Sequence, residues 1–207
     1  EKLLLLLDDK RNDIYIHIDK KVNQFDFDYF QRLCTSATIR YTRRLNVRWG
    51  QQSLVLAEME LFDLAYKHGP YHYYHLISGS DLPLKSQDVI HNFFANKTET
   101  YLHCNPVVTD WNRQRMSIYH FFIHPRNHFE EMFRNWITHK QFLLKIDRLR
   151  KCKMTILKGW EWGSLPHSAV HTLVTHRKDI VKFTRFTLCS DEIYKQRRLL
   201  CLTSLWI

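Results

Sequence analysis

Residues 52–84 read QSLVLAEMELFDLAYKHGPYHYYHLISGSDLPL, and this stretch decides the fold. Within 52–67, apolar residues recur every three or four positions, which predicts a helix with one wide apolar face. Gly69 and Pro70 then end the helix, because neither residue supports its continuation. The aromatic and apolar run at 73–77 is typical of a strand, and a polar loop follows it. The stretch therefore predicts a helix, a strand and a loop in succession.

Similar segments continue on both sides of this stretch. Asp13–Asp19 alternates polar and β-branched residues, as strands do. We expect further strands at 100–103 and 154–157, and helices at 86–94, at 129–150, from Pro166 past His171, and from Ser190. Segment 110–126 is rich in Arg and aromatic residues and receives no assignment. Strands that alternate with helices predict an α/β domain with a largely parallel central sheet flanked by helices.

The ends of two predicted strands carry polar residues. In α/β sheets, ligands bind at the carboxyl ends of the strands. His17–Asp19 and Ser78–Asp81 each follow a strand, so we expect them near a common cleft. No internal repeat or low-complexity linker divides the chain, and its length suits one domain over residues 1–207.

Composition excludes several classes of protein. The 207 residues are 44% hydrophobic with only five Gly and five Pro, so the chain is neither disordered nor collagen-like. The longest apolar run, Leu3–Leu7, is far shorter than the roughly 20 residues of a membrane-spanning helix. The five cysteines are widely spaced and form no C-x-x-C pair, which excludes a disulfide-stapled module and a Cys-rich zinc module. Reduced thiols are expected.

Charge indicates an anionic partner. Lys and Arg number 31 against 21 Asp and Glu, which gives a net charge of +10. The basic residues form short clusters without any known nucleic-acid-binding motif, so a basic nucleic-acid-binding protein is the alternative that rests on charge and aromatics alone. His120, His124 and His128 recur every four residues, but Pro125 interrupts the helix that would align them. His167 and His171 could share a helical face but bring no third ligand, so we expect no metal site.

Three motifs place polar or small residues at element ends. In the first, Asp19 can accept hydrogen bonds from a ribose or base edge beside His17; the alternative is that both only close a strand. The second holds Trp49 and a glycine before a helix, where the backbone can approach a ligand closely; Trp49 is otherwise a core aromatic. In the third, small residues around Ser80 leave room for a ligand and Asp81 can bind sugar hydroxyls; an ordinary capped turn is the alternative.

The fourth motif joins two segments, 159–165 (GWEWGSL) and 189–192 (CSDE). Paired aromatics beside a carboxylate, as in Glu161 and Trp162, are a common way to hold a sugar. A carboxylate that is free of a tight Arg partner can act as a general base if burial raises its pKa toward neutrality.

Taken together and in this order, the four motifs resemble the core-2/I-branching glycosyltransferase family, which includes beta-1,6-N-acetylglucosaminyltransferases and peptide O-xylosyltransferases. The resemblance runs from about Asn12 to Gln196. Its carrying segments are YIHIDKK, VRWGQQSLV, YYHLISGSDLPLKS, GWEWGSLPHSAV and CSDEIYKQ. The spare loops and scarce cysteines are closer to the bacterial branch than to the disulfide-rich Golgi members.

The resemblance implies a GT-A-like fold and an inverting transfer from a UDP-sugar, with N-acetylglucosamine or xylose as the sugar, to a hydroxyl of a glycan or protein acceptor. It implies no metal-binding D-x-D and no cofactor. The family's catalytic base falls on Glu192 and its sugar-orienting acid on Glu161, with Trp162 lining the pocket. Asp81, with Ser80 beside it, matches the loop that faces the donor sugar. His17 and Asp19 match the strand end that meets the nucleotide, and we add Trp49 to that nucleotide-binding set.

The chain departs from the family pattern at its ends. It stops 15 residues after Glu192 (207 − 192), and 199–207 does not look like the family, so we expect a member truncated at both ends. Arg197 and Arg198 either meet the diphosphate or are simply solvated. A truncated, inactive sugar- or nucleotide-binding domain is the alternative function. A bacterial member would be cytoplasmic and associate peripherally with the inner membrane face; a eukaryotic one would lie in the Golgi membrane through a missing anchor.

Overall fold

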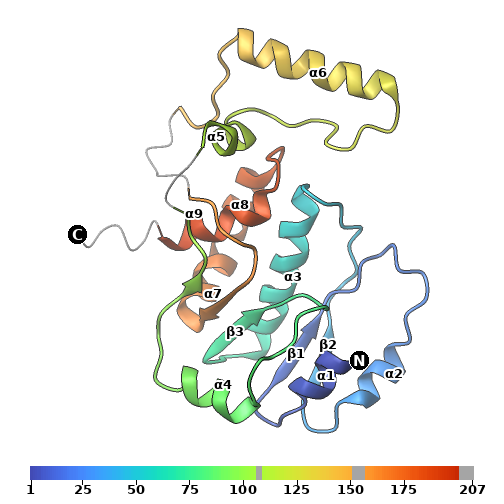
Figure 1. Ribbon diagram of the computed structural model, residues 1–207, viewed down its shortest axis with the longest axis vertical. Coiled ribbons are helices and arrows are strands. Elements are labelled where there is room, and N and C mark those ends of the chain that lie inside the picture. The colour runs from blue at the N-terminus through green and yellow to red at the C-terminus, as the bar shows by residue number, and fades with distance from the viewer. Residues whose placement is uncertain (106–108, 151–156, 201–207) are drawn as a thin grey trace. The chain divides into compact units, whose positions relative to one another are not determined.

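The computed structural model describes residues 1–105, 109–150 and 157–200 (Figure 1). The chain divides into two compact units, which are described separately. Unit 1 comprises Glu1–Val47, Ala57–Leu102 and Trp162–Val174, and unit 2 comprises Arg48–Leu56, His103–Glu161 and Thr175–Ile207. That the whole chain is one glycosyltransferase domain stays a prediction.

Unit 1 combines helices with two small sheets. Its elements, in chain order, are α1 (Lys2–Leu7), β1 (Asp13–Ile16), α2 (Phe27–Leu33), β2 (Thr38–Tyr41), α3 (Gln52–His68, whose first turn belongs to unit 2), β3 (Tyr73–Leu76), α4 (Gln87–Phe94), β4 (Tyr101–Leu102), β5 (Gly163–Pro166) and α7 (His167–Thr175). Strands β1 and β2 pair in parallel, with Asp13 opposite Thr38. The other sheet has the order β3-β5-β4 and is antiparallel, with Tyr74 opposite Leu165.

Apolar periodicity explains the core of unit 1. On α3, Met59, Phe62 and Ala65 are buried, and their spacing of three residues places them on one side of the helix. On β3, Tyr74 and Leu76 are buried while the residues between and before them point outward, as strand alternation requires. These two patterns are the ones that the sequence predicts most directly.

Backbone contacts fix two of the strands of unit 1. The carboxylate of Asp8, just after α1, accepts hydrogen bonds from the backbone amides of Thr35, Ser36 and Ala37 at 2.7–2.9 Å, immediately before β2. These bonds lower the pKa of Asp8 to about 2. In β5, a Cβ on Gly163 would overlap the side chain of Leu102 and approach the Tyr101 carbonyl, so glycine permits β4 to pair closely there.

Unit 2 is helical among its described residues. It contains α5 (Asp110–Ser117), α6 (His128–Leu143), α8 (Arg177–Thr184), a 3-10 turn at Ser190–Glu192 and α9 (Tyr194–Leu200). Met116, Leu149 and Ile193 form its apolar cluster, with Phe183 packed against them.

One arginine joins several loops of unit 2. The guanidinium of Arg148 donates to the carbonyls of Ile118, Phe183, Arg185 and Phe186 at 2.9–3.4 Å. A half-buried guanidinium suits this role because its five N–H groups can satisfy several backbone carbonyls at once.

The mixed α/β fold is confirmed, but a largely parallel sheet holds only for β1 and β2. The three-stranded sheet is antiparallel because β5, which the sequence does not reveal as a strand, inserts between β3 and β4. The expected start of a helix at Pro166 is also wrong: Pro166 ends β5, and α7 begins at His167. Helix α6 ends at Leu143 instead of 150, because Lys145 has a φ of +51°.

Other predictions agree with the structure or fall outside its described part. The predicted helices at 52–67 and 86–94 correspond to α3 and α4, and the predicted strands at 73–77 and 100–103 to β3 and β4. The strand predicted at 154–157 lies almost wholly outside the described residues. Cys34, Cys104 and Cys189 are free thiols, whereas Cys152 and Cys201 are not described. No helix in the part of the chain that the structure describes has both the length and the apolar character to cross a bilayer.

Candidate active site

Glu192 ends a short 3-10 turn whose backbone is fixed by two glycine-containing segments of unit 2. Cys189, at the start of the turn, has a φ of +47°. This left-handed backbone conformation is unfavourable for residues other than glycine. Its amide donates to the Gly50 carbonyl at 2.9 Å, and the Glu192 carbonyl accepts from the Gly159 amide at 2.9 Å. The second and fourth sequence motifs therefore meet at this turn.

Two cations hold the carboxylate of Glu192. Its Oε2 lies 2.8 Å from the guanidinium of Arg115 and 3.3 Å from the ammonium of Lys158. Arg115 is buried and also donates to the Cys189 carbonyl at 3.0 Å, so one guanidinium fixes both the carboxylate and the turn that carries it. Glu192 therefore does not meet the condition of a carboxylate free of a tight Arg partner. The hydrogen bond from Arg115 and the printed approach of Lys158 are both to Oε2.

The segment Gly159–Glu161 lies against the same helix α9 that follows Glu192. The side-chain amide of Gln196 donates to the Trp160 carbonyl at 3.0 Å and to the His103 carbonyl at 3.3 Å. A Cβ on Gly159 would overlap the His103 carbonyl oxygen and the Gln196 amide, so only glycine fits this approach. The segment is therefore positioned by its backbone.

Trp160 presents an aromatic face beside this segment. Its ring stacks on the His103 ring with centroids 4.6 Å apart and planes 16° apart, and the side chain stays exposed. The sequence singles out Trp162, which lies in unit 1 just before β5 and is partly exposed. The W-E-W pattern contains both tryptophans, so the sequence alone does not favour one of them as a sugar-binding ring. The greater exposure of Trp160 in the structure distinguishes it from Trp162. Glu161 lies between the two tryptophans, in unit 2.

Trp49 is a surface residue, not a core aromatic. Its side chain is 73% exposed, and its carbonyl accepts a hydrogen bond from His124 Nε2 at 2.6 Å. Gly50 follows with a φ of +69°, a conformation that favours glycine, and it makes the bond to Cys189. Trp49 is therefore held beside the segment that leads to Glu192.

His17 and Asp19 follow β1 in unit 1, and their side chains contact other residues of that unit. His17 Nε2 accepts a hydrogen bond from the Leu45 amide at 3.1 Å, so that nitrogen is unprotonated. Burial lowers the pKa of His17. Asp19 accepts from the Lys21 amide at 2.9 Å and pairs with the Lys21 ammonium at 3.3 Å. Although burial acts in the opposite direction, the Lys21 contacts lower the pKa of Asp19. His17 thus joins the segments that follow β1 and β2, and Asp19 stabilises the turn after β1.

The loop Ser78–Asp81 is an exposed, capped turn after β3. Asp81 accepts from the Ser78 amide at 2.6 Å, and the hydroxyls of Ser78 and Ser80 lie 2.9 Å apart. A Cβ on Gly79 would have no neighbouring atom within 4 Å. Strands β1 and β3 belong to different sheets, so the expectation of a common cleft with His17, which assumed one parallel sheet, loses its basis.

Comparison with known families decides the identity. The family model described as Core-2/I-Branching enzyme matches residues 1–203. The chain belongs to this family. The match extends beyond the 12–196 segment in which the sequence motifs lie, and it includes the region after Glu192. No curated protein matches the chain. Membership identifies this core-2/I-branching family member as a glycosyltransferase that uses a sugar donor and an acceptor.

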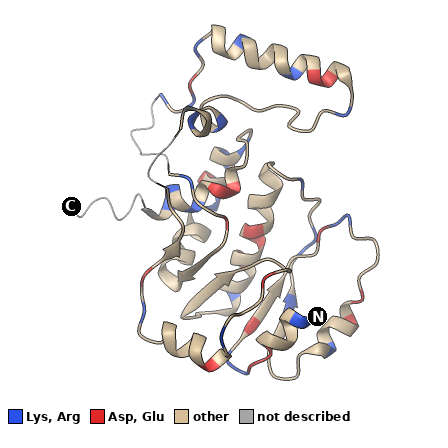
Figure 2. Cartoon of the chain, viewed as in Figure 1, with Lys and Arg blue, Asp and Glu red and all other residues tan. Residues whose placement is uncertain are grey.

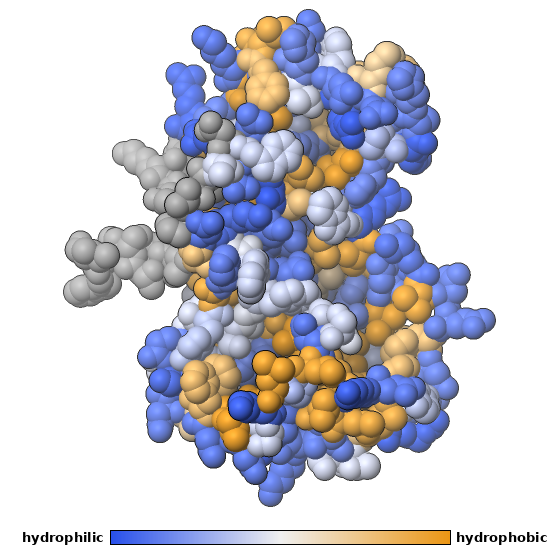
Figure 3. Space-filling model, viewed as in Figure 1, coloured by the Kyte–Doolittle hydropathy of each residue, from blue (hydrophilic) through white to orange (hydrophobic). Residues whose placement is uncertain are grey.

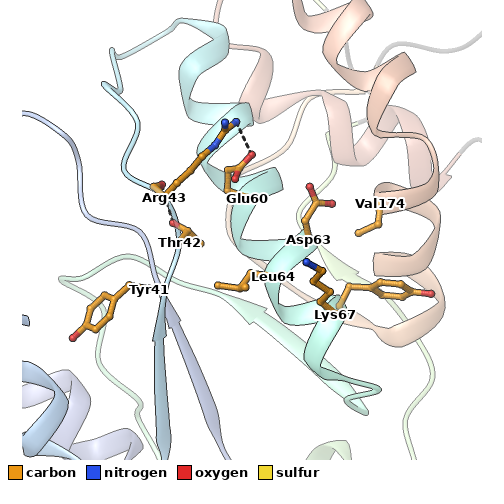
Figure 4. Close-up of a pocket in the computed structure, with 9 residues that line it drawn as sticks. Tyr41, Thr42, Arg43, Glu60, Asp63, Leu64, Lys67 and Val174 are labelled. Carbon is orange, nitrogen blue, oxygen red and sulfur yellow. Dashed lines mark hydrogen bonds and ion pairs between the residues drawn. The ribbon is translucent and has the colours of Figure 1, made fainter.

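The core-2/I-branching chain has a pocket of about 420 Å³ in unit 1 that holds none of the predicted site residues (Figure 4). Its lining comes from the end of β2, from α3 and from α7, and includes the ion pair between Arg43 and Glu60 at 3.0 Å. Asp63 and Lys67 line it as well, so acidic and basic groups are mixed. This balance does not favour an anionic ligand.

A second pocket, of about 320 Å³, lies between α8 and α9 in unit 2. Lys182, Arg197 and Arg198 line it together with one acid, Asp179. The Arg197 guanidinium lies 3.6 Å from the centroid of the Phe183 ring, so this side chain is packed and not simply solvated. Elsewhere, Lys and Arg are spread along both units of the chain (Figure 2).

Metal ligands do not gather in the described part of the chain. No group of three or more His, Cys, Asp or Glu side chains suited to a metal ion occurs among the described residues. That the family member works without metal or cofactor stays a prediction.

Proposed function

We propose that the protein is an inverting, metal-independent glycosyltransferase of GT-A-like fold that moves a sugar from a UDP-sugar to a hydroxyl of a glycan or protein acceptor. N-acetylglucosamine and xylose are the proposed sugars. UDP is already a good leaving group, so the protein need not supply a strong acid. The acceptor hydroxyl is a poor nucleophile, so a positioned base must take its proton during attack. One base on the face opposite the leaving group gives inversion.

The fixed carboxylate of Glu192 is the observation that supports this proposal most strongly. Arg115 and Lys158 both contact Oε2, so the orientation of the group is set before a substrate arrives. Such preorganisation is what a general base requires. We assign Oε1 as the atom that accepts the hydroxyl proton, because the hydrogen bond from Arg115 is to Oε2.

The other predicted residues take supporting roles in the proposal. Asp81, Ser80, Glu161 and Trp162 bind the donor or acceptor sugar, to which the exposed ring of Trp160 adds a stacking surface. His17, Asp19 and Trp49 meet the nucleotide. Without a metal, Arg and Lys side chains and helix N-termini would neutralise the diphosphate. The proposed location is the cytoplasm, at the inner face of a bacterial membrane.

A donor screen with a matched pair of variants tests the proposal. The purified chain is given UDP-N-acetylglucosamine, UDP-xylose and other UDP-sugars, and UDP release is measured. We expect Glu192→Gln to abolish release while calorimetry still detects UDP binding. Glu99→Gln, an exposed acid whose contacts are local, should retain full activity. Full activity of Glu192→Gln would refute the assignment of the base.

A second candidate is a domain that binds a sugar nucleotide without turnover. The same two cations on Glu192 favour it, because a carboxylate already engaged by Arg115 and Lys158 must share its electron density with them. The two candidates differ in one measurement. UDP binding with no release from any donor supports the binding domain, whereas release that depends on Glu192 supports the transferase.

A further inference from the structure

Helix α6 carries its apolar side chains outward. Spacings of three, four and seven residues place one group of them on a single side of the helix. We call this group the α6 stripe; it consists of Phe129, Met132, Phe133, Trp136 and Leu143. Its members are 39–68% exposed. Figure 3 shows apolar side chains gathered among hydrophilic ones over α6.

The opposite side of α6 contacts unit 2 through polar groups. Gln141 is the one fully buried side chain of this helix. Its amide accepts from the Tyr119 amide at 2.7 Å and donates to the Tyr119 carbonyl at 2.9 Å. A surface helix ordinarily places its apolar side against the core and its polar side in water, and here the arrangement is reversed. A contiguous exposed apolar surface of this kind marks an interaction site.

The rings of the stripe form a continuous ridge. Phe129 and Phe133 are nearly parallel, with centroids 6.3 Å apart, and Phe133 stacks on Trp136 at 5.7 Å. Lys140 lies one turn after Trp136 on the same side, and its ammonium is 5.9 Å from the centre of the indole ring. A lysine whose stem runs along apolar groups while its charge reaches a polar layer is typical of a helix at a membrane surface.

Charge around the stripe favours an anionic surface. The acids of α6 are already neutralised: Glu130 pairs with Arg126 and Glu131 with Arg134. From Arg126 to Lys145 there are four Lys and Arg against two Glu, a net +2, within a chain of net charge +10. The cations left without an acidic partner in this segment, Lys140 and Lys145, stand at the C-terminal end of the stripe.

We propose that α6 is an interfacial helix that binds the surface of an anionic lipid bilayer. The stripe enters the boundary between headgroups and acyl chains, and Lys140 and Lys145 reach the lipid phosphates. The combination of a stacked aromatic ridge with in-line lysine selects a bilayer over a folded protein partner, whose groove would have to bury that ammonium. This inference does not depend on sugar transfer.

Vesicle flotation of the full chain tests the inference. Vesicles of equal parts phosphatidylglycerol and phosphatidylcholine are compared with vesicles of phosphatidylcholine alone. We expect binding to the anionic vesicles, and a loss of about tenfold or more when Phe129→Ser and Trp136→Ser are combined. Lys140→Glu should weaken binding to anionic vesicles severalfold and leave the neutral vesicles unaffected.

A matched control uses two exposed apolar residues of another helix. Val89→Ser combined with Phe93→Ser on α4 removes similar apolar surface outside the stripe and should leave vesicle binding unchanged. Size-exclusion chromatography is run on all variants without lipid. Absence of binding to anionic vesicles, or equal loss in the α4 control, would overturn the proposal. A change of oligomeric state confined to the stripe variant would also overturn it, because the stripe would then join two copies of the chain.

Discussion

The buried guanidinium of Arg115 lies 2.8 Å from the carboxylate of Glu192, although the two residues are 77 positions apart in the sequence. Only 6% of the Arg115 side chain is exposed, against 31% for Glu192. A buried cation therefore presents a partly exposed carboxylate to solvent. Since Arg115 also bonds the backbone carbonyls of Leu188 and Cys189, the candidate base and its turn are held by the same group.

Removing Arg115 should destabilise unit 2. We expect Arg115→Ala to lower the free energy of unfolding by about 3 kcal/mol, because it leaves buried carbonyls and a partly buried carboxylate without their donor. Urea titration followed by tryptophan fluorescence measures the change. Lys158→Ala removes the more exposed partner of Glu192 and should cost less than about 1 kcal/mol. Equal effects of the two substitutions would contradict the structural role given to Arg115.

Substitution by alanine should lower the free energy of unfolding at Gly159 and leave it unchanged at Gly79. A Cβ at Gly159 overlaps the His103 carbonyl and the Gln196 amide, so Gly159→Ala should lower the free energy of unfolding by about 2 kcal/mol or more. Gly79 has nothing within 4 Å of its Cβ position, so Gly79→Ala should be neutral. Thermal unfolding of both variants compares them directly. If the Gly159→Ala protein were as stable as the wild type, the close contact of Gly159 with His103 and Gln196 would be contradicted.

The buried amide of Gln141 should be essential for holding α6. Gln141→Leu keeps a similar volume but leaves the amide and the carbonyl of Tyr119 unpaired, which should cost about 2–3 kcal/mol. Chemical denaturation gives the value. His139→Leu, on the exposed side of the same helix, serves as the control and should change stability little. Equal unfolding free energies of the two variants would contradict the role of Gln141 in holding α6.

Stability should decrease as pH falls below neutrality, and His17 should contribute to that decrease. Burial, aided by Arg44 and opposed by Asp19 and Glu60, places the pKa of His17 below its ordinary value. Below about pH 6.5 the unfolded chain therefore binds a proton that the folded imidazole does not, and this contribution to stability is lost as pH approaches the folded pKa.

The measurement compares unfolding free energies at about pH 7.5 and about pH 5.5. We expect His17→Gln to reduce the difference between the two values without removing it, because burial also lowers the pKa of His91 and His120. The exposed His139→Gln is the control and should leave the difference unchanged. An unaltered difference in His17→Gln would exclude His17 as a contributor.

Local patterns gave the helices and strands that bury periodic apolar residues, and they failed where tertiary contacts decide the structure. The spacing of Met59, Phe62 and Ala65 predicts α3 because one helix face is buried. Strand β5 reads GSLP and shows no such alternation; it is a strand because β3 and β4 pair with it. The sheet direction follows from that pairing, which no local signal encodes.

The candidate site shows the same division. Sequence motifs selected Glu192 and Trp49, and the structure links their segments through the bond between Gly50 and Cys189. The partners of Glu192 were not predictable, because Arg115 lies in a segment that received no assignment and its pairing depends on long-range packing. The roles assigned to the site residues in sugar transfer stay predictions.

The attachment of α6 through Gln141 has a consequence for how the chain opens. The contacts of α6 with its unit include the two hydrogen bonds of the Gln141 amide and the edge contact of Phe133 with Phe122 at 5.9 Å. None of these involves the apolar cluster of Met116, Leu149 and Ile193, so α6 can detach while that cluster remains packed. Its backbone amides should then exchange with solvent deuterium sooner than those of the core, as a separate cooperative segment. A bilayer that covers the outward rings would slow this exchange, so lipid would supply a packing layer that the described residues do not provide for this side of the helix.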